Sequence, residues 1–580
     1  MKQYKKYIKP YLSAFILGPI FMIVEVIGEV LMPKFMSMII DHGVVSGNIP
    51  YIIGMGAAMI GTAIFMLGGG VLGAWFAVKA SVNFAADLRK DVFSKVQDFS
   101  FANIEKFSTG SLVTRLTNDV TNMQNVIQMA LRMMLRAPGM LIGGLIMAII
   151  MNAKLAIVLL IVIPVLILIL SFVMKVAFPR FDTMQGKIDS LNSRIQESIT
   201  NVRVVKSFVR DDFEKETFQK ANEELKEKTL RAMKVVILTM PVMTLAMNIT
   251  TLCVVWLGGK QILVGTMTVG ELTAFTTYIV QILMSLMMVA MVMIMGSRAI
   301  ASSHRIKEVL NTEIDLKNKE QVDTSLEIQN GKVEFRDVSF RYYKNHGENV
   351  LDHINLTIEP GEIVGILGGT GTGKSSLVQL IPRLYDATEG EVLVDGIDVR
   401  DYPLQTLRNA VGMVLQKNTL FSGTIIDNLR WGDKDASEEE VRHMADLAKA
   451  DMFVSNFTDG YETELGQGGV NVSGGQKQRL CIARALLKRP KILILDDSTS
   501  AVDTATEAEI RKAFRTEIKD STKIIIAQRI SSVIDADKII VLDNGTIVGL
   551  GTHSELMKTC DEYQEIYYSQ KDKEEEVQAG

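Results

Sequence analysis

Long apolar stretches are the strongest pattern in the N-terminal half of this sequence. A helix needs about 20 apolar residues to cross a bilayer, and six stretches reach that length: 11–33, 51–78, 132–151, 155–178, 235–259 and 271–297. Each stretch predicts one membrane-spanning helix. Because the number is even, we expect the chain to return to the side of the membrane on which it began.

Two connections between these stretches are too long to be turns. Lys79–Asn125 and Arg180–Lys234 are polar, charged and rich in helix-forming residues, so we expect helical hairpins that project roughly 35 Å beyond the membrane. Lysine and arginine are frequent in them and in Met1–Lys9 but scarce in the short connections, 41–50, 152–154 and 260–270. The positive-inside tendency then places both termini of a multi-pass plasma-membrane protein in the cytoplasm.

The pattern changes after residue 310. A polar stretch precedes strand-like segments that are punctuated by glycine and later alternate with helical periodicity, as in α/β domains. We therefore expect a six-helix transmembrane domain with long intracellular helical extensions, a linker, an α/β domain and a charged C-terminal tail. The predicted boundaries are 1–310, 311–330, 331–570 and 571–580.

Composition supports two unlike halves. Hydrophobic residues make up 48% of the chain, and only four of its 32 methionines, Met413, Met444, Met452 and Met557, follow residue 310. A wholly soluble protein is therefore excluded, and a lipid bilayer is an expected partner. The net charge of −4 offers no basic surface for phosphates along a duplex, so we expect no nucleic-acid partner.

Two carboxylates interrupt the first apolar stretch. Glu25 and Glu29 are four residues apart and share one helical face. Ionised groups are costly against lipid, so we expect both to face the interior of the helix bundle. They could form a contact for cargo or a gate, or they could simply hydrogen-bond or pair with Arg132 or Arg136.

The sixth apolar stretch carries methionines at helical spacing. They share one stripe: Met284, Met287, Met288, Met291 and Met295. Methionine side chains are flexible and polarizable, so such a stripe can line an adaptable apolar cavity, or it can be ordinary packing.

A phosphate-binding loop begins the chemistry of the α/β domain. Ile363–Leu367 reads as a buried strand and leads into Gly368, Gly369, Thr370, Gly371, Thr372, Gly373, Lys374 and Ser375, which precede a helical pattern. In this strand-loop-helix context, glycine backbone N–H groups wrap phosphates, the lysine reaches the β- and γ-phosphates, and the Ser375 hydroxyl binds Mg²⁺. We include Ser376 in the same ATP site. A structural glycine turn would not need the Lys-Ser pair.

A second buried strand, Lys491–Leu495, ends in two carboxylates. Because Asp496 follows a strand expected beside the phosphate loop, it can hold the Mg²⁺. Asp497 occupies the position of a general base that orients water against the γ-phosphate. Together these motifs predict a P-loop ATPase with ATP and Mg²⁺ as its cofactors.

A third motif makes the resemblance specific. Ser473, Gly474, Gly475 and Gln476 open a helical pattern between the two strand motifs. With six preceding spans, the chain resembles an exporter-type ABC transporter half, in which membrane and nucleotide-binding parts are fused. That resemblance implies a dimer with two ATP molecules sandwiched between subunits, where the Ser-Gly-Gly-Gln helix of one chain completes the site of the other. Alone, these residues could merely cap a helix.

The resemblance assigns further roles one residue at a time. Tyr342, or its neighbour Tyr343, corresponds to the aromatic residue that stacks on adenine. Gln416 corresponds to the glutamine that contacts Mg²⁺ and links the site to the membrane helices. Asp503 lies in the loop that crosses to the opposite site. The hairpin tips near Ala102–Phe107 and Ser207–Asp212 then contact nucleotide-binding domains.

Two residues depart from the family pattern, which has glutamate and histidine where this chain has Asp497 and Gln528. Aspartate is about 1.5 Å shorter, and glutamine cannot become cationic, so the site should bind ATP well and hydrolyse it poorly. We therefore expect this chain to form a heterodimer with a second half-transporter that has the full Glu/His pair. We expect the heterodimer to export hydrophobic or amphipathic cargo. A slow homodimer, a nucleotide-gated or channel-like subunit and an importer are the alternatives.

Overall fold

The computed structural model describes residues 2–319, 322–342 and 348–579, and the chain divides into two compact units. The first, called the helical unit here, comprises Met1–Gln97 and Thr109–Thr312. The second, called the nucleotide unit, comprises Asp98–Ser108 and Glu313–Gly580. A short segment from the first half of the sequence therefore belongs to the second unit.

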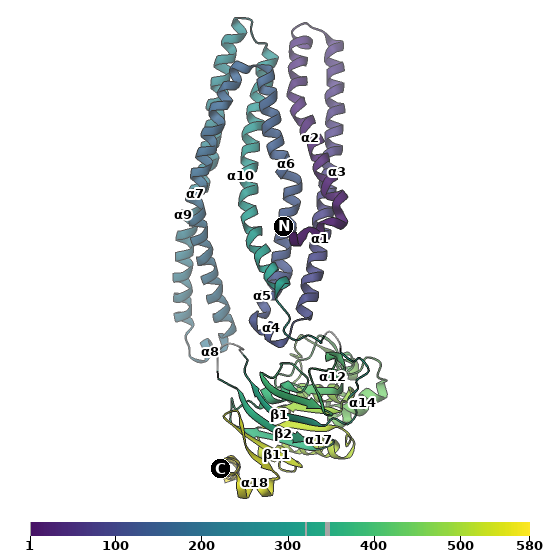
Figure 1. The fold of residues 1–580 in the computed structure, drawn as a ribbon. Coiled ribbons are helices and arrows are strands. Elements are labelled where there is room, and N and C mark those ends of the chain that lie inside the picture. Colours follow the sequence, from purple (N-terminus) through teal and green to yellow (C-terminus); the bar gives the residue numbers. More distant parts are fainter. Residues whose placement is uncertain (1, 320–321, 343–347, 580) are drawn as a thin grey trace. The chain divides into compact units, whose positions relative to one another are not determined.

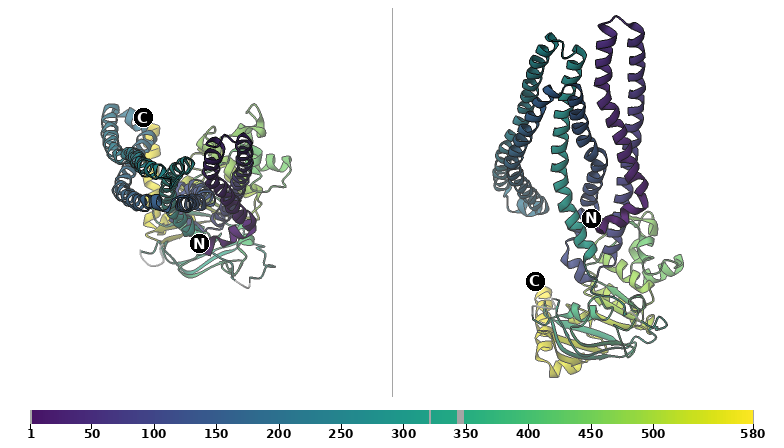
Figure 2. Two further views of the ribbon diagram at one scale, coloured as in Figure 1. Left: turned by 90° about the horizontal axis from the view of Figure 1, so that it is seen from above. Right: turned by 45° about the horizontal axis from the view of Figure 1, so that its top comes forward.

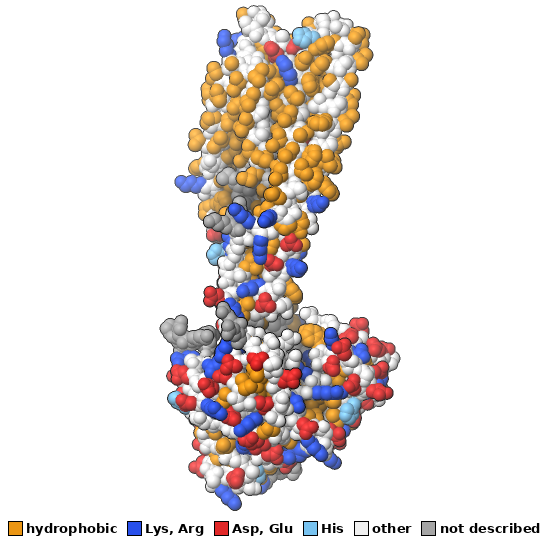
Figure 3. All heavy atoms as spheres, turned by 45° about the vertical axis from the view of Figure 1, so that its right-hand side comes forward, with side chains coloured by type: hydrophobic (Ala, Val, Ile, Leu, Met, Phe, Trp, Pro, Cys, Tyr) orange, Lys and Arg blue, Asp and Glu red, His pale blue; other side chains and the backbone are white. Residues whose placement is uncertain are grey.

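Six long helices form the helical unit, and all six contain a stretch that is apolar enough to cross a membrane. They are α2 (Leu12–Met38), α3 (Ile49–Gln97), α6 (Val120–Met151), α7 (Ala153–Thr200), α9 (Asp211–Leu263) and α10 (Val269–Asn311). The predicted spans are thus confirmed, and α3, α7 and α9 continue as helices into the polar connections, as the two expected hairpins require. Figure 3 shows hydrophobic side chains gathered over these helices, as expected of a surface that faces lipid.

The long helices associate in pairs. In Figures 1 and 2, α2 lies beside α3, α6 beside α10, and α7 beside α9. Glycines bring the first pair close together, because a Cβ added to Gly69 of α3 would lie 3.0 Å from the carbonyl oxygen of Phe21. Shorter elements complete the unit: η1 (Lys2–Tyr4), α1 (Lys5–Ile8), η2 (Lys9–Tyr11), η3 (Ile39–Val44), α5 (Thr109–Thr114), η4 (Arg115–Asp119) and α8 (Val202–Ser207).

The methionine stripe on α10 does not share a single environment. Met284 is exposed, whereas Met287 packs partly against a buried cluster that includes Ile282 and Leu286. The side chains of Met291 and Met295 lie outside the described residues. Ordinary packing therefore accounts for at least Met287.

A six-stranded sheet is the centre of the nucleotide unit. Its order is β12-β11-β3-β10-β9-β6, and every neighbouring pair is parallel except β11 with β12. The strands are β3 (Ile363–Gly368), β6 (Val411–Val414), β9 (Ile492–Asp496), β10 (Thr522–Ile526), β11 (Lys538–Asp543) and β12 (Thr546–Gly551). In β9, Ile492 and Ile494 pack into one core cluster while Leu493 and Leu495 pack into another, so both faces of the sheet are covered.

Smaller sheets and surrounding helices complete this unit. An antiparallel sheet has the order β2-β1-β4-β5, and β7 pairs with β8. These strands are β1 (Val333–Phe340), β2 (Leu351–Ile358), β4 (Glu389–Val394), β5 (Ile397–Asp398), β7 (Gly423–Thr424) and β8 (Glu464–Leu465). The helices are α4 (Phe101–Lys106), α11 (Lys374–Leu380), α12 (Leu404–Ala410), α13 (Ile425–Leu429), α14 (Glu438–Leu447), α15 (Asp451–Val454), η5 (Gly460–Glu462), α16 (Gly474–Leu487), α17 (Thr504–Thr516), η6 (Ile530–Ser532), α18 (His553–Thr559) and α19 (Asp561–Ala579).

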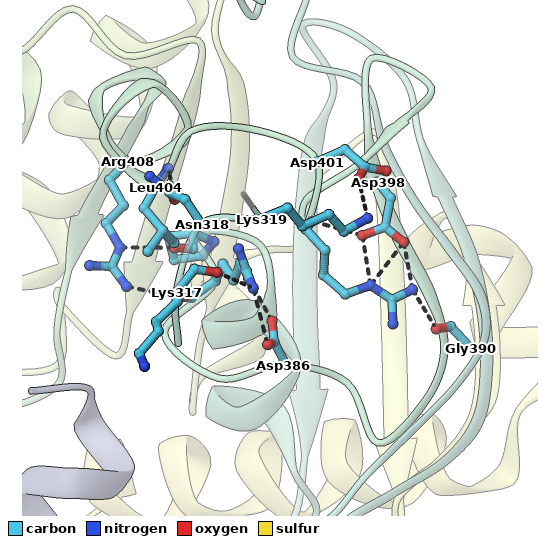
Figure 4. Close-up of polar contacts among 12 residues, drawn as sticks. Lys317, Asn318, Lys319, Asp386, Gly390, Asp398, Asp401, Leu404 and Arg408 are labelled. Carbon is cyan, nitrogen blue, oxygen red and sulfur yellow. Dashed lines mark hydrogen bonds and ion pairs between the residues drawn. The ribbon is translucent and has the colours of Figure 1, made fainter. Parts of the chain in front are cut away.

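The segment that follows α10 is bound to the nucleotide unit rather than loose. The Lys317 carbonyl accepts a hydrogen bond from Arg383 at 3.3 Å, and the Asn318 side chain accepts one from the Leu404 backbone at 3.0 Å. Figure 4 shows Lys317, Asn318 and Lys319 among these polar contacts. Lys319 pairs with Asp401. At the other end of the unit, α19 begins at Asp561 and continues through the expected tail, so residue 571 is not an element boundary.

Helix α4 is the tip of the first hairpin and packs within the nucleotide unit. Asn103 donates from Nδ2 to the Glu313 carbonyl at 3.1 Å, and the Tyr385 hydroxyl donates to Oε1 of Glu105 at 2.9 Å. The tip near Ala102–Phe107 therefore contacts this domain as expected. The other expected tip, Ser207–Asp212, belongs to the helical unit.

Candidate ATP-binding site

Parallel pairing of β3, β9 and β10 brings the phosphate loop, the two aspartates and Gln528 to the C-terminal ends of neighbouring strands. Ile526 of β10 pairs with Ile366 of β3 on one side and with Asp496 of β9 on the other. The phosphate loop, the two aspartates and the segment that holds Gln528 all follow the carboxyl ends of these strands. These strand ends are where ligands bind in α/β sheets of this kind.

The phosphate loop has a backbone that only glycine adopts easily. Gly368, Gly371 and Gly373 have φ angles of 148°, 85° and 93°. A Cβ on Gly373 would lie 2.7 Å from the Val350 carbonyl oxygen, so a larger residue would clash as well as be strained. In the part of the chain that the structure describes, the N–H groups of residues 370, 371 and 373 have no hydrogen-bond acceptor. These donors, followed by the start of α11, form a cradle that fits phosphate oxygens.

Lys374 lies across this loop. Its Nζ donates to the carbonyl oxygens of Gly368 at 3.0 Å and Gly369 at 2.5 Å. Burial lowers the pKa of the Lys374 ammonium, while Asp496 and Asp497 oppose that effect. An ammonium forms stronger hydrogen bonds with charged phosphate oxygens than with neutral carbonyl oxygens. The Lys374 side chain is therefore placed to leave the two carbonyls and bind a phosphate.

The expected metal ligands lie together. The Ser375 hydroxyl donates to Oδ1 of Asp496 at 3.0 Å, and Asp496 is only 3% exposed. Burial raises the pKa of the Asp496 carboxyl, partly offset by the hydrogen bond from Ser375. No group of three or more His, Cys, Asp or Glu side chains with metal-site geometry occurs among the described residues. A hydroxyl, a carboxylate and the Gln416 amide are instead hard oxygen ligands, which suit Mg²⁺ that also binds phosphates.

Asp497 has an unusual backbone and a defined partner. Its φ angle is +48°, in the left-handed region, which turns the chain sharply after β9. Gln528 donates from Nε2 to Oδ2 of Asp497 at 2.7 Å. Burial raises the pKa of the Asp497 carboxyl, and hydrogen bonds from Gln416 and Gln528 act in the opposite direction. Asp497, the predicted general base, is thus in contact with both Gln416 and Gln528.

Tyr342 lies next to the phosphate-loop helix. Its hydroxyl and that of Ser376 are 2.8 Å apart, and its ring meets Tyr385 edge-on with a centroid distance of 5.1 Å. More than a third of Tyr342 is exposed, so the ring has a face that could receive a base. The alternative, Tyr343, lies outside the described residues.

The Ser-Gly-Gly-Gln motif begins helix α16. The Gln476 N–H donates to Oγ of Ser473 at 3.3 Å, and the Ser473 N–H donates to Oε1 of Gln476 at 2.9 Å. These two hydrogen bonds form a capping box, so the motif does cap the helix, which was the alternative that the sequence allowed. Gly474 leaves the start of the helix exposed, and a Cβ on Gly475 would lie 2.6 Å from the Ala501 carbonyl oxygen.

Asp503 and two residues that sequence reasoning did not assign complete the surroundings. Asp503 caps α17 by accepting from the Thr506 N–H at 2.9 Å. Gln478 accepts from the Ala501 N–H at 3.0 Å and so connects α16 to the segment before Asp503. Tyr385 connects the Tyr342 ring to Glu105 of α4. Neither Gln478 nor Tyr385 belongs to a recognisable sequence motif. The available sequence signal was a polar side chain at a position that the surrounding pattern predicts to be buried.

Known proteins match the chain along nearly its whole length. Family models described as "ABC transporter transmembrane region" and "ABC transporter" match residues 15–286 and 351–500. The "Uncharacterized ABC transporter ATP-binding protein YfiB" of Bacillus subtilis is 40% identical over 570 residues, 98% of either chain. The "ATP-dependent lipid A-core flippase" of Desulfotalea psychrophila is 34% identical over 83% of this chain and 84% of its own.

A solved structure shares the fold. A bacterial Atm1-family ABC exporter with ATP bound has a TM-score of 0.79, with 24% sequence identity and 98% of both chains covered. The chain therefore belongs to the ABC transporter family, fuses the ABC transmembrane region to an ABC ATPase domain, and has the fold of that exporter.

Proposed function

We propose that this chain is one subunit of a heterodimeric exporter whose own ATP site binds nucleotide firmly and hydrolyses it slowly. The observation that carries the proposal is the cluster of Asp497 and Gln528 at the sheet edge, joined at 2.7 Å. Its chemistry differs from a Glu/His pair in reach and in charge, and both differences slow the same step.

The shorter carboxylate limits base catalysis. A general base must lie within hydrogen-bond reach of the water that it activates, and a displacement of about 1 Å can cost about a hundredfold in rate. In this chain one oxygen of Asp497 is also occupied by Gln528. A neutral amide stabilises charge on a transferring phosphoryl group less than an imidazolium does.

The remaining site residues support nucleotide binding. In this proposal Tyr342 stacks on adenine, the loop 368–373 with Lys374 and Ser376 holds the phosphates, and Mg²⁺ is held by Ser375, Gln416 and Asp496. The metal, when bound, neutralises phosphate charge. Each of these side chains lies in or beside the cradle described above.

The exposed start of α16 supports a non-identical partner. Within the Ser-Gly-Gly-Gln motif the Ser473 and Gln476 N–H groups are taken by the capping box, whereas those of Gly474 and Gly475 have no acceptor among the described residues and could bind an anion that this chain's own phosphate loop does not hold. We infer that this motif completes a Glu/His site on the companion half-transporter, with Asp503 in the crossing loop. Two copies of this chain would instead combine two slow sites. The transporter would lie in the plasma membrane with both termini in the cytoplasm.

The cargo is proposed to be hydrophobic or amphipathic. One relative is named for flipping lipid A-core, which is amphipathic. ATP would draw the nucleotide-binding domains together, and α4 would transmit that closure to the membrane helices. The cavity between these helices would then open to the opposite side of the membrane.

The test compares ATP hydrolysis by the purified chain alone with hydrolysis by its co-purified companion complex. We expect the complex to be at least about tenfold faster, and a glutamate-to-glutamine change in the companion to abolish most of its activity. ATP-dependent accumulation in inside-out vesicles tests the pump. Passive flux alone would favour the channel-like alternative, and equally fast turnover by the self-paired chain would rule out the heterodimer proposal.

A further inference from the structure

An arginine joins the two carboxylates within the membrane-spanning helices. Nη1 of Arg136 on α6 lies 3.1 Å from Oε1 of Glu25, and Nη2 lies 3.1 Å from Oε2 of Glu29. Of the two arginines that the sequence offered, Arg136 is therefore the one that pairs. Glu25 is near the middle of α2, about 20 Å from either helix end at 1.5 Å per residue.

The ion pairs of this cluster are unequal in number. Two carboxylates contact the single guanidinium of Arg136, and Arg132, one turn earlier on α6, forms no ion pair with either carboxylate among the described residues. Charged groups within a membrane are costly and are retained for function more often than for stability. One glutamate would suffice to hold α2 against α6 through Arg136. The second carboxylate can therefore accept one further positively charged group.

A buried acceptor beside the cluster also lacks a partner. Gln281 of α10 donates from Nε2 to the Glu29 carbonyl oxygen at 3.2 Å. Its Oε1 atom is buried and accepts no hydrogen bond from any residue that the structure describes. Leaving such an acceptor unpaired costs about 1–3 kcal/mol. The missing partner is therefore a hydrogen-bond donor.

The cluster can be reached by a ligand. The side chains of Arg136 and Glu29 are 28% and 29% exposed, whereas that of Glu25 is 16% exposed. Glu25 is accommodated by Gly70 of α3, where an added Cβ would lie 3.2 Å from the carboxylate. The inner carboxylate is thus held by packing, and the outer one is open.

We propose that Glu25, Glu29 and Gln281, beside Arg136, bind one ammonium group of an amphipathic cargo molecule. An ammonium supplies a second ion-pair partner for the two carboxylates and the N–H donor that Oε1 of Gln281 lacks. The group can belong to a free cationic amphiphile or to an aminophospholipid headgroup, since both present the same chemistry. The inference rests on the exporter function and not on the heterodimer.

The experiment measures binding of dansylcadaverine, a fluorophore with one primary ammonium, to the full-length chain in phosphatidylglycerol nanodiscs without nucleotide. Its N-acetyl derivative is the neutral comparison. We expect E29Q to weaken dansylcadaverine binding at least about tenfold and to change binding of the neutral derivative less than twofold. Adding phosphatidylethanolamine distinguishes the sources, because competition identifies the lipid headgroup and its absence identifies free cargo.

Two further variants keep the result interpretable. E227Q removes a carboxylate that also pairs with an arginine, Arg231, but on an exposed helix surface, and it should leave probe binding unchanged. R136Q should tighten dansylcadaverine binding, whereas a structural clamp predicts weakening by both R136Q and E29Q. Equal loss of the charged and neutral probes, or no binding of dansylcadaverine to the wild-type chain, overturns the proposal. Because no nucleotide is present, neither result bears on hydrolysis or pairing.

Discussion

Gln528 donates a hydrogen bond from Nε2 to Oδ2 of Asp497 over 2.7 Å, although 31 residues separate them in the chain. The contact forms because β9 and β10 are parallel neighbours and both residues follow the carboxyl ends of those strands. It brings the two departures from the family pattern into direct contact. Changes at these residues are therefore expected to act together.

Restoring the family residues should restore hydrolysis. We expect Asp497→Glu to raise kcat of the purified chain about tenfold and Asp497→Glu with Gln528→His to raise it about a hundredfold, because reach and charge are both recovered. Phosphate release at saturating ATP gives the rates. Unchanged rates in both variants would show that side-chain length and charge do not limit the site.

Removing the phosphate-loop ammonium should weaken nucleotide binding. Lys374→Met is expected to lower the affinity for a fluorescent ATP analogue at least about tenfold, since a charge-assisted contact to phosphate is lost. Lys512→Met removes an exposed lysine of the same unit and is the control. Equal affinities of the two variants would show that Lys374 does not touch the phosphates.

The buried carboxylate of Asp496 should destabilise the nucleotide-free protein at neutral pH. Burial raises its pKa, so the folded chain holds that proton more tightly than the unfolded chain does. The cost of ionisation is fully present above the raised pKa and disappears as the pH falls below the ordinary value. Asp496→Asn should therefore raise Tm by about 2 °C at pH 8, with a gain that shrinks on acidification.

The same variant should lose the stabilisation that Mg²⁺ and ATP give. Differential scanning fluorimetry across pH, with and without both ligands, measures these effects. Asp520→Asn changes an exposed carboxylate and should alter Tm little. A lower Tm of Asp496→Asn at every pH, without ligands, would contradict the expectation.

The attachment of α4 should depend on one hydroxyl. Tyr385→Phe removes only the donor to Glu105, at a cost of about 1 kcal/mol. Amide hydrogen exchange in 98–108 should then accelerate about fivefold, and transport should fall more than ATP hydrolysis. Tyr568→Phe alters an exposed tyrosine and serves as the comparison. Unaltered exchange would mean that other contacts, such as that of Asn103 with Glu313, hold the helix.

Much of the architecture could be predicted from local pattern alone. The six spans, the helical hairpins and the strand-loop-helix around Lys374 depend on contiguous residues, because apolar length, helix propensity and glycine backbone freedom are properties of neighbouring positions. The proposed metal ligands Ser375 and Asp496 were also expected to meet, since a parallel sheet aligns the ends of its strands.

Other features depended on contacts between distant segments. The predicted boundary at residue 310 placed 98–108 in the membrane domain, with the tip near Ala102–Phe107 expected only to contact a nucleotide-binding domain; in the structure the whole segment belongs to the nucleotide unit, where it packs through Tyr385 and the segment after α10. The sequence also offered two arginines for Glu25 and Glu29, and only the geometry of α2, α6 and α10 selected Arg136 and left Gln281 with an unpaired oxygen. Short-range pattern determines which elements form and what chemistry each carries. Strand order and helix packing decide which side chains meet. They bring together residues that are far apart in the chain, and the local sequence pattern does not show that such residues are in contact.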